Sequence, residues 1–237
     1  MKPKYKRVLL KISGEGMAGT AKTGIDAAVV MQTAAQIAEL QKNGVQVCVV
    51  IGGGNFFRGA KNAGEMMDRS VADQIGMLAT VMNAMAMKSA LEKLGSPVCV
   101  FSGISVPQVC DNYTFREAYK ALSDGKTVVF AGGTGSPYFT TDTGAALRAI
   151  EMHCDILLKA TQVDGVYDSD PRENPHAKRY DKVSFSEVLE KHLNVLDMTA
   201  ATMAQDADLA VMIFAMNREN SIVNAVCGNE KCTIIKK

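Results

Sequence analysis

The sequence predicts an α/β protein in which a mostly parallel, open sheet lies between two layers of helices, a three-layer αβα sandwich. Short apolar runs alternate with longer helix-like segments along all 237 residues, which is typical of successive βαβ units. Glycine clusters follow three of the apolar runs, where open parallel sheets bind their ligands. Hydrophobic residues make up 47% of the chain and charged residues 22%, so a large core is expected.

The first half of the chain supplies four of the expected strands and three of the expected helices. A helix over 26–44 has Asp26 as its expected N-cap and Gly44 as its stop. A second helix is expected over 69–94, where Leu78, Val81, Met82 and Met85 suggest one buried face in the core or at a subunit interface. The expected strands are 6–12, 45–51, 98–101 and 127–131, the third helix is 114–125, and 103–110 is expected to form a hairpin.

The second half continues the alternation. A helix over 141–153 precedes a strand over 155–160, and the Pro- and Asp-rich stretch 164–176 is expected to be a loop or a hairpin. Ser184 and Glu187 form a capping box that opens the next helix. The remaining elements are helices over 198–205 and 221–226 and strands over 209–214 and 232–237. We expect one domain over 1–237, with no clear linker and no internal repeat.

Composition excludes several classes of protein. A net charge of +1 argues against a strongly basic nucleic-acid surface and against a polybasic membrane anchor. The N-terminus starts like a signal peptide, but Lys11 interrupts its apolar run after Val8–Leu10, so we expect a cytoplasmic protein. None of the six cysteines forms a C-x-x-C pair, which favours reduced structural thiols over a zinc site.

The stretch KISGEGMAG contains a literal G-x-G-x-x-G after the first expected strand. A dinucleotide-binding motif also requires a helix that starts at the glycines and an acidic residue at the end of the second strand. The helix is expected only from Asp26, and the second strand ends in Gly52-Gly53-Gly54. A P-loop is excluded as well, because Thr20 and Ala60 follow the two G-x4-G spacings where a lysine is needed.

Charged residues beside the glycine clusters indicate a phosphate site that is neither a dinucleotide-binding motif nor a P-loop. Lys11 lies inside the first strand, where its burial would be costly without an anion. Arg58 follows GGGNFF, Asp142 opens a helix after GGTGSPYFTT, and Lys159 ends an apolar strand. Phosphoryl transfer depends mainly on positioning and charge neutralisation, which cations and glycine loops provide. Three simpler roles remain open: a solvated loop arginine for Arg58, an N-cap for Thr141 or Asp142, and a structural Lys159.

Five segments together resemble the amino acid kinase superfamily, and within it the bacterial uridylate (UMP) kinases, over essentially the whole chain. These segments are LLKISGE, VVIGGGNFFRG, DQIGMLATVMNAMA, AGGTGSPYFTTDTGAALRA and LLKATQVDGVYDSDP. The resemblance implies an αβα sandwich and transfer of the γ-phosphoryl group of ATP to UMP with Mg²⁺. It also implies a homohexamer that GTP activates and UTP inhibits, with a UMP-binding half over about 1–150 and an ATP-binding half over about 151–237.

The resemblance assigns roles residue by residue. Lys11, Arg58, Asp142 and Lys159 would be catalytic, with Asp142 orienting the lysines or the metal, and Mg²⁺ arriving with ATP rather than on protein ligands. ATP would contact Lys11, Ile12, Ser13, Gly14, Gly54, Arg58, Thr161, Gln162, Tyr167 and Asp170. UMP would contact Gly53, Asp73, Thr134, Gly135, Ser136, Pro137, Tyr138, Phe139, Thr140 and Thr141. GTP would act at Gly19, Thr20, Ala21, Lys22, Thr23 and Gly24, and Asp197 is an extra candidate.

Two other functions remain open at this point. A kinase of a carboxylate such as acetylglutamate, glutamate or carbamate would use the same superfamily fold, although Arg58 and the GTGSPYFTTD loop suit a nucleotide better. A nucleotide-binding or oxyanion-storage protein without catalysis is the second alternative. The presence of Lys11, Arg58 and Asp142 together argues against it.

Overall fold

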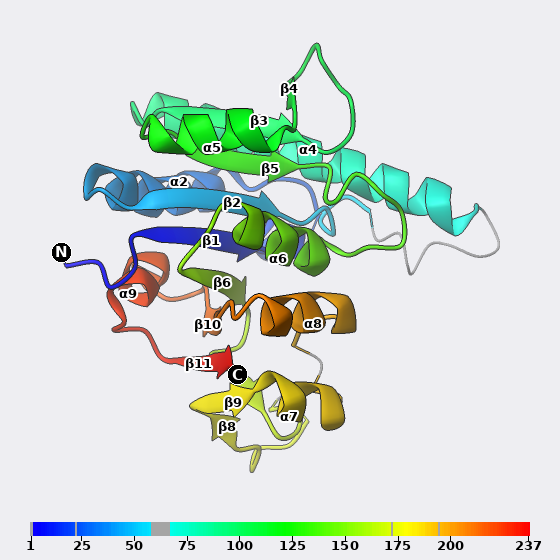
Figure 1. Ribbon diagram of the computed structural model, residues 1–237, viewed down its shortest axis with the longest axis vertical. Helices are drawn as coiled ribbons and strands as arrows, with labels where there is room; N and C mark the ends of the chain where they lie inside the picture. Colours follow the sequence, from blue (N-terminus) through cyan, green and yellow to red (C-terminus); the bar gives the residue numbers. More distant parts are fainter. Residues whose placement is uncertain (1, 22, 58–66, 172, 194) are drawn as a thin grey trace.

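A large sheet forms the middle layer of the molecule (Figure 1). The computed structural model describes residues 2–21, 23–57, 67–171, 173–193 and 195–237, and within them this sheet has nine strands in the order β4-β3-β5-β2-β1-β6-β10-β11-β9. The strands are β1 (Arg7–Ile12), β2 (Gln46–Ile51), β3 (Val98–Ser102), β4 (Asp111–Asn112), β5 (Thr127–Ala131), β6 (Ile156–Thr161), β9 (Lys182–Ser184), β10 (Val211–Ala215) and β11 (Cys232–Lys236).

Neighbouring strands of this sheet run parallel except β10 and β11, which are antiparallel. Parallel neighbours need crossover connections, and helices supply most of them. The longer helices are α2 (Ala27–Lys42), α4 (Arg69–Lys93), α5 (Phe115–Ser123), α6 (Thr141–Glu151), α7 (Phe185–Glu190), α8 (Met198–Asp206) and α9 (Ser221–Cys227). The predicted three-layer α/β fold is confirmed.

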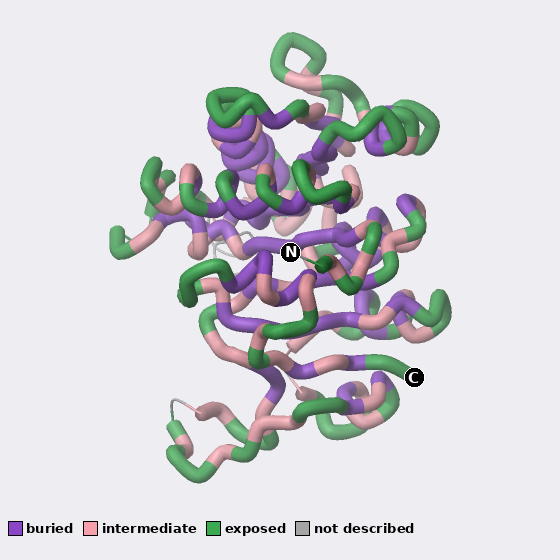
Figure 2. The backbone as a smooth tube through the Cα atoms, turned by 90° about the vertical axis from the view of Figure 1, so that its left-hand side faces the viewer, coloured by how far each residue is buried: buried purple, intermediate pink, exposed green. Residues whose placement is uncertain are grey.

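Two hydrophobic clusters fill the two faces of the sheet. One packs the strands against α2, α4 and α9, and the other packs them against α5, α6, α7 and α8. Along β1, Val8, Leu10 and Ile12 belong to the first cluster and Leu9 belongs to the second, as the two-residue period of a strand requires. Figure 2 shows the buried residues concentrated in the strands and along the inner sides of the helices.

Most element predictions agree with the structure. Asp26 caps α2 by accepting from Ala28 N and Val29 N, and Gly44 follows its end with a φ of 81°. Ser184 caps α7 by accepting from Glu187 N. The stretch 164–176 leads into a small antiparallel pair of β7 (Val166–Tyr167) with β8 (Arg179–Tyr180), which fits the expected hairpin excursion.

Two expectations were wrong, and a third is met only in part. Residues 103–110 form turns rather than a hairpin, and the two-residue β4 that follows pairs parallel to β3 at the sheet edge. A short helix, α1 (Gly14–Met17), starts directly after β1, and a 3-10 turn, η1 (Gly19–Ala21), follows it. On α4, Val81 and Met85 pack against the core on the sheet, whereas Leu78 and Met82 are about half exposed, so a subunit interface for these two stays a prediction.

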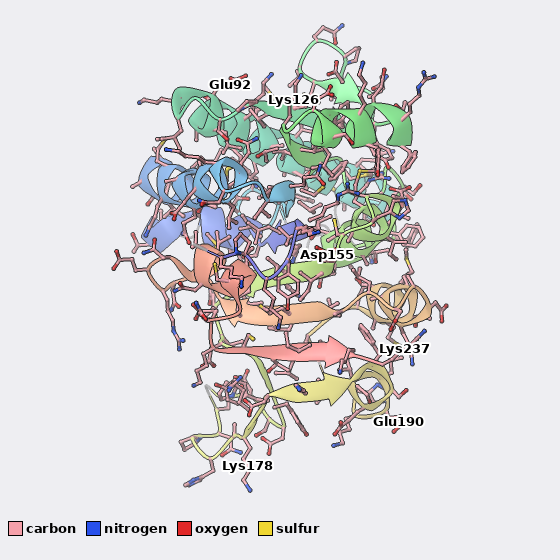
Figure 3. The ribbon with its side chains drawn as sticks, turned by 60° about the vertical axis from the view of Figure 1, so that its left-hand side comes forward. Glu92, Lys126, Asp155, Lys178, Glu190 and Lys237 are labelled. Carbon is pink, nitrogen blue, oxygen red and sulfur yellow. The ribbon has the colours of Figure 1, made fainter. Side chains whose placement is uncertain are left out.

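The outside of the molecule carries the charge. The charged side chains labelled in Figure 3, Glu92, Lys126, Asp155, Lys178, Glu190 and Lys237, all belong to exposed residues. All six cysteines are free thiols, and only Cys48 is fully buried. Over the described ranges, every helix is too short or too polar to cross a membrane.

Candidate active site

Two lysines stand side by side on the central strands. Lys11 on β1 and Lys159 on β6 are register partners in a parallel pair. Lys11 shares its side of β1 with Leu9, and Lys159 shares its side of β6 with Leu157, so both side chains point to the face that α6 and α8 cover. Because side chains alternate along each strand and the two strands are in register, the two ammonium groups lie next to each other at the carboxyl ends of β1 and β6.

Asp142 joins the two lysines. Its Oδ1 lies 2.7 Å from Lys11 Nζ, and its Oδ2 accepts a hydrogen bond of 2.6 Å from Lys159 Nζ. The three side chains are only 10–14% exposed. Burial raises the pKa of Asp142, but the attraction of Lys11 and Lys159 outweighs burial and holds this pKa below its ordinary value. Asp142 is therefore ionised at neutral pH.

Asp142 is positioned by the first turn of α6, in which it lies. Thr140 is the N-cap, and its hydroxyl accepts from Asp142 N and Thr143 N, so neither Thr141 nor Asp142 caps the helix. Asp142 lies in the first turn, where the helix dipole favours a negative charge. Asp197 accepts hydrogen bonds from the hydroxyls of Thr140 and Thr143 and caps α8. Asp197 thus fixes the start of α6 to α8.

Lys159 is less basic than a free lysine. Burial lowers its pKa, the charge of Lys11 lowers it further, and the attraction of Asp142 offsets these effects only in part. Lys159 Nζ also donates to the carbonyl of Val195. The cluster of Lys11, Asp142 and Lys159 carries two positive charges and one negative charge. This buried excess of positive charge favours the binding of an anion beside it.

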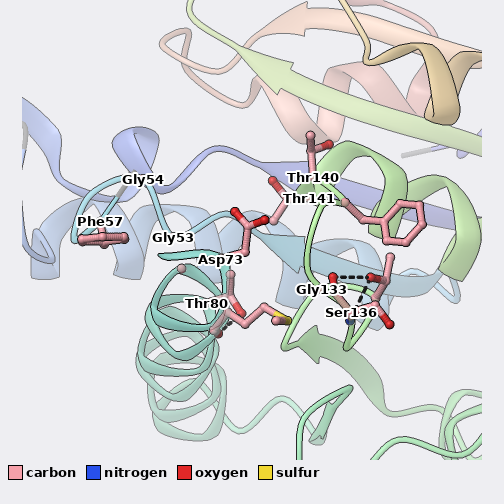
Figure 4. Close-up of a pocket in the computed structure, with 13 residues that line it drawn as sticks. Gly53, Gly54, Phe57, Asp73, Thr80, Gly133, Ser136, Thr140 and Thr141 are labelled. Atoms are coloured by element: carbon pink, nitrogen blue, oxygen red, sulfur yellow. Dashed lines mark hydrogen bonds between the residues drawn. The ribbon is translucent and has the colours of Figure 1, made fainter. Parts of the chain in front are cut away.

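A pocket of about 180 Å³, shown in Figure 4, has Thr141, the residue before Asp142, in its lining. Its walls come from the glycine turn after β2, one face of α4, and the loop between β5 and α6. Seven of the ten residues predicted to bind UMP line it: Gly53, Asp73, Thr134, Ser136, Phe139, Thr140 and Thr141. Gly135, Pro137 and Tyr138 do not line it, and Gly54, predicted for ATP, does.

Helix α4 contributes residues that the sequence did not single out. Gly76, Met77 and Thr80 line the pocket together with Asp73. These positions are three or four residues apart, which places them on one helix face, and this spacing could have identified them. Asp73 itself accepts from Tyr138 N at 2.8 Å and from Arg69 Nε at 2.8 Å. It therefore ties α4 to the loop across the pocket.

Five of the ten residues predicted to bind ATP line two other pockets. Tyr167 and Asp170 line a pocket of about 390 Å³ with Lys191, His192 and Val195. Ser13, Thr161 and Gln162 line a pocket of about 240 Å³ that α2 borders. The hydroxyl of Tyr167 donates to Asp164, which also pairs with Lys231 at 2.7 Å.

The charged cluster connects the first pocket with the Tyr167 pocket. Thr141, which lines the pocket of Figure 4, directly precedes Asp142 in α6. Val195, which lines the Tyr167 pocket, accepts the hydrogen bond from Lys159. The cluster therefore has direct neighbours in the linings of both pockets.

Two glycines are required because backbone approaches them closely. A Cβ at Gly14 would lie 2.6 Å from both Gly52 O and Gly54 N. A Cβ at Gly53 would lie 2.6 Å from Gly76 O on α4. These contacts bring the start of α1, the turn after β2 and α4 close together beside the pocket.

Some predicted residues do not face these pockets. Ile12 belongs to the core cluster on the α2 side of the sheet, so only its backbone can face a ligand. Arg58 and Lys22 lie outside the described residues. Of the segment predicted to bind GTP, Gly19 does line the pocket of about 240 Å³. Gly19–Ala21 forms η1, and Gly19 and Gly24 have positive φ values of 56° and 73°.

The donor set suits a metal held by phosphate oxygens. Both oxygens of Asp142 are taken by lysines, and across the described parts of the chain no three His, Cys, Asp or Glu side chains gather at one point. Mg²⁺ commonly keeps several waters and binds through substrate phosphates with few protein carboxylates. The residues present therefore fit a Mg²⁺ ion that enters with a nucleotide.

Comparison with known proteins agrees with this geometry. Residues 6–215 match the model of the amino acid kinase family. A uridylate kinase of Hyphomonas neptunium is 48% identical over 236 residues, covering 100% of this chain and 94% of that protein. A uridylate kinase of Erythrobacter litoralis is 49% identical over 234 residues, covering 99% and 98%.

Solved structures give the same result. The crystal structure of UMP kinase from Ureaplasma parvum superposes with a TM-score of 0.93 at 36% identity, covering 100% of both chains. The structure of UMP kinase from Bacillus anthracis has a TM-score of 0.93 at 35% identity, covering 99% of this chain and 97% of that one. The similarity thus extends over the whole chain, including the strands and helices that carry the cluster and its pockets.

Proposed function

This chain belongs to the amino acid kinase family, and we propose that it transfers the γ-phosphoryl group of ATP to UMP, giving ADP and UDP in pyrimidine nucleotide synthesis. The full-length similarity to uridylate kinases makes the chain a nucleoside monophosphate kinase. The observation that carries the proposal is the buried Lys11–Asp142–Lys159 cluster between two pockets. One pocket would hold the phosphate acceptor and the other the donor.

The acceptor pocket is proposed to hold UMP. Asp73 presents a carboxylate to it, which suits the two hydroxyls of a ribose. The loop from Thr134 to Thr141 supplies hydroxyl and backbone groups that can pair with the polar edge of a uracil. All the residues that line this pocket lie before residue 150, and all those that line the Tyr167 pocket lie after it. This division supports a UMP-binding half over about 1–150 and an ATP-binding half over about 151–237, while the pocket of about 240 Å³ takes its walls from both.

The lysines are proposed to neutralise the charge of the phosphoryl group in transit. A lysine ammonium has three donors. Lys159 uses two of them, on Asp142 and on the carbonyl of Val195, and Lys11 forms an ion pair with Asp142, so donors remain on both lysines for phosphate oxygens. Asp142 would hold both lysines in place rather than accept a proton, because the phosphate of UMP is already ionised near pH 7. Mg²⁺ bound to the ATP phosphates would supply further charge neutralisation.

The proposal also gives roles to Arg58 and to the 19–24 segment, which contains Lys22. Arg58 would grip a phosphate with its two-pronged guanidinium group. Activation by GTP through residues 19–24, inhibition by UTP and assembly as a homohexamer follow from the resemblance to bacterial uridylate kinases. We also propose a cytoplasmic location. A flat initial rate across a GTP titration, at fixed ATP and UMP, would remove activation from the proposal.

An acceptor panel tests the function. The purified protein is assayed with ATP and Mg²⁺ against UMP, CMP, AMP and GMP, and against acetylglutamate, glutamate and carbamate. We expect UDP as the main product. Phosphorylation of one of the acids would instead favour a carboxylate kinase, and nucleotide binding without any product would favour a non-catalytic binding protein.

A further inference from the structure

Two asparagines form a buried pair that no site prediction included. Asn55 follows the glycine turn after β2, and Asn83 lies on α4. Asn55 Nδ2 donates to Asn83 Oδ1 at 2.9 Å, and Asn83 Nδ2 donates back to Asn55 Oδ1 at 2.8 Å. Asn55 is 2% exposed and Asn83 is 0% exposed. The two amides therefore pair face to face, out of contact with water.

The remaining N–H of each amide reaches a different part of the chain. Asn83 Nδ2 donates to Gly52 O at 2.7 Å, and Asn55 Nδ2 donates to Gly24 O at 2.7 Å. Gly24 N in turn donates to the backbone carbonyl of Asn55 at 3.0 Å. Each amide group has two N–H donors, so all four are used. Removing either side chain would leave a buried polar group of its partner unpaired.

The pair also lies against the start of α1 and beside the lining of the acceptor pocket. The position that a Cβ on Gly14 would occupy is only 2.5 Å from Asn55 Oδ1. Gly53 and Gly54, which line the acceptor pocket, directly precede Asn55, and Thr80, another lining residue, lies one turn before Asn83 on α4. One hydrogen-bonded unit thus contacts the start of α1, the glycine turn, α4 and the end of the 19–24 segment.

We propose that Asn55 and Asn83 are positioning residues that set the Gly52–Gly54 turn and transmit the state of the 19–24 segment to it. The pair touches no reacting group, so it acts through the turn. Because Asn83 reaches Gly24 only through Asn55, a change at Asn83 should be felt at Gly24. The kinetic part of this proposal rests on the proposed UMP kinase activity, and the conformational part does not.

The test compares Asn55→Ala, Asn83→Ala and the double variant with Gln41→Ala as a matched control. Gln41 also uses its amide to bridge two loops, donating to Pro97 O and Gly125 O at 2.8 Å each, before β3 and β5 begin. We expect each asparagine variant to raise the KM for UMP about tenfold and to weaken any response to GTP. The double variant should be no worse than either single one, because both changes break one unit.

Amide hydrogen exchange gives a readout that does not need activity. We expect Asn83→Ala to speed exchange at residues 23–25 as well as at 52–57, and Gln41→Ala to leave both stretches unchanged. If Asn83→Ala fails to fold, Asn83→Ser keeps one donor and is measured in its place. A lower melting temperature with unchanged KM, or faster exchange confined to α4, would overturn the positioning role. If the wild-type protein makes no UDP, the proposed function fails while the exchange result still decides the coupling.

Discussion

At the scale of single residues, the site depends on two lysines and one aspartate whose charges do not cancel. Lys11 and Lys159 are buried beside Asp142, and a lysine is seldom buried without a partner. Since one carboxylate serves both lysines, the cluster is one negative charge short. A phosphate group in transit would supply it, which gives the cluster a reason to exist beyond stability.

Removal of Lys11 tests this reading. Lys11→Met keeps most of the apolar stem and leaves Asp142 paired with Lys159, so the fold should persist. We expect kcat to fall about 10²- to 10³-fold, the usual loss for one preorganised charge-stabilising group. Steady-state kinetics with a thermal melt measures both effects. Lys126→Met, at an exposed position, is the control, and an unchanged kcat in Lys11→Met would refute the role of Lys11.

The lowered pKa of Lys159 predicts how activity and stability depend on pH. Its charge in the free protein should be lost below the ordinary value of 10.5, so kcat/KM, which reports groups of the free enzyme, should decline on the alkaline side before a free lysine would titrate. Between the folded-state pKa and 10.5 the unfolded chain binds more protons, so this group makes the free energy of unfolding rise with pH there.

A pH–rate profile of Lys159→Arg provides the measurement. Arginine stays charged throughout this range, so the alkaline decline should move to higher pH in the variant, even if its plateau rate is lower. An alkaline decline at the same pH in both proteins would show that another group causes it.

At the scale of elements, the meeting of α1 with the turn after β2 decides the shape of the site. α1 begins at Gly14, because Ser13 caps it by accepting from Gly16 N, and Gly14 has no room for a side chain. Gly16 differs, since the nearest atom to a Cβ there is Ser13 Oγ at 3.3 Å. The two glycines of one motif thus have different roles.

A pair of alanine variants separates those roles. In Gly14→Ala the new Cβ would press on the backbone at Gly52 and Gly54, which should lower the free energy of unfolding by about 1–3 kcal/mol. Displacement of the turn should reduce kcat/KM by about a hundredfold. Gly16→Ala should change both quantities little. Chemical denaturation and steady-state kinetics compare the variants, and equal effects at both positions would contradict this assignment.

At the scale of the whole molecule, α4 links the site to the surface. Its inner face packs on the sheet and lines the acceptor pocket, while Leu78 and Met82 are 48% and 47% exposed on its outer side. Neighbouring apolar side chains on an outer helix face suit a subunit contact. The proposed homohexamer gives these residues a partner surface.

A charge on this face should therefore weaken assembly. We expect Leu78→Glu to sediment as a smaller particle than the wild-type protein, because burying the new carboxylate at an interface is costly. Met198→Glu places a charge at an exposed position of α8, on the other face of the sheet. It should leave the mass of the particle unchanged. An unchanged mass in Leu78→Glu would exclude this face from the contact.

The layered α/β fold, the positions of most elements and the residue types of the cluster can be predicted from the sequence alone. Strand and helix periods are local properties, so residues 6–12, 26–44 and 69–94 could be assigned without the fold. The short α1 was missed, because a helix of four residues with two glycines has almost no periodic signal. Lys11, Asp142 and Lys159 were singled out by their places beside apolar runs and glycines.

Which of these residues contact one another depends on the tertiary structure. Lys11 and Lys159 are far apart in sequence, and the parallel pairing of β1 with β6 makes them neighbours. The pair of Asn55 with Asn83 was also invisible, since an asparagine in a turn or on a helix has many ordinary roles. Contacts between distant segments depend on strand order and on how a helix is turned against the sheet. Local sequence patterns do not contain either, because they record only a residue's immediate neighbours.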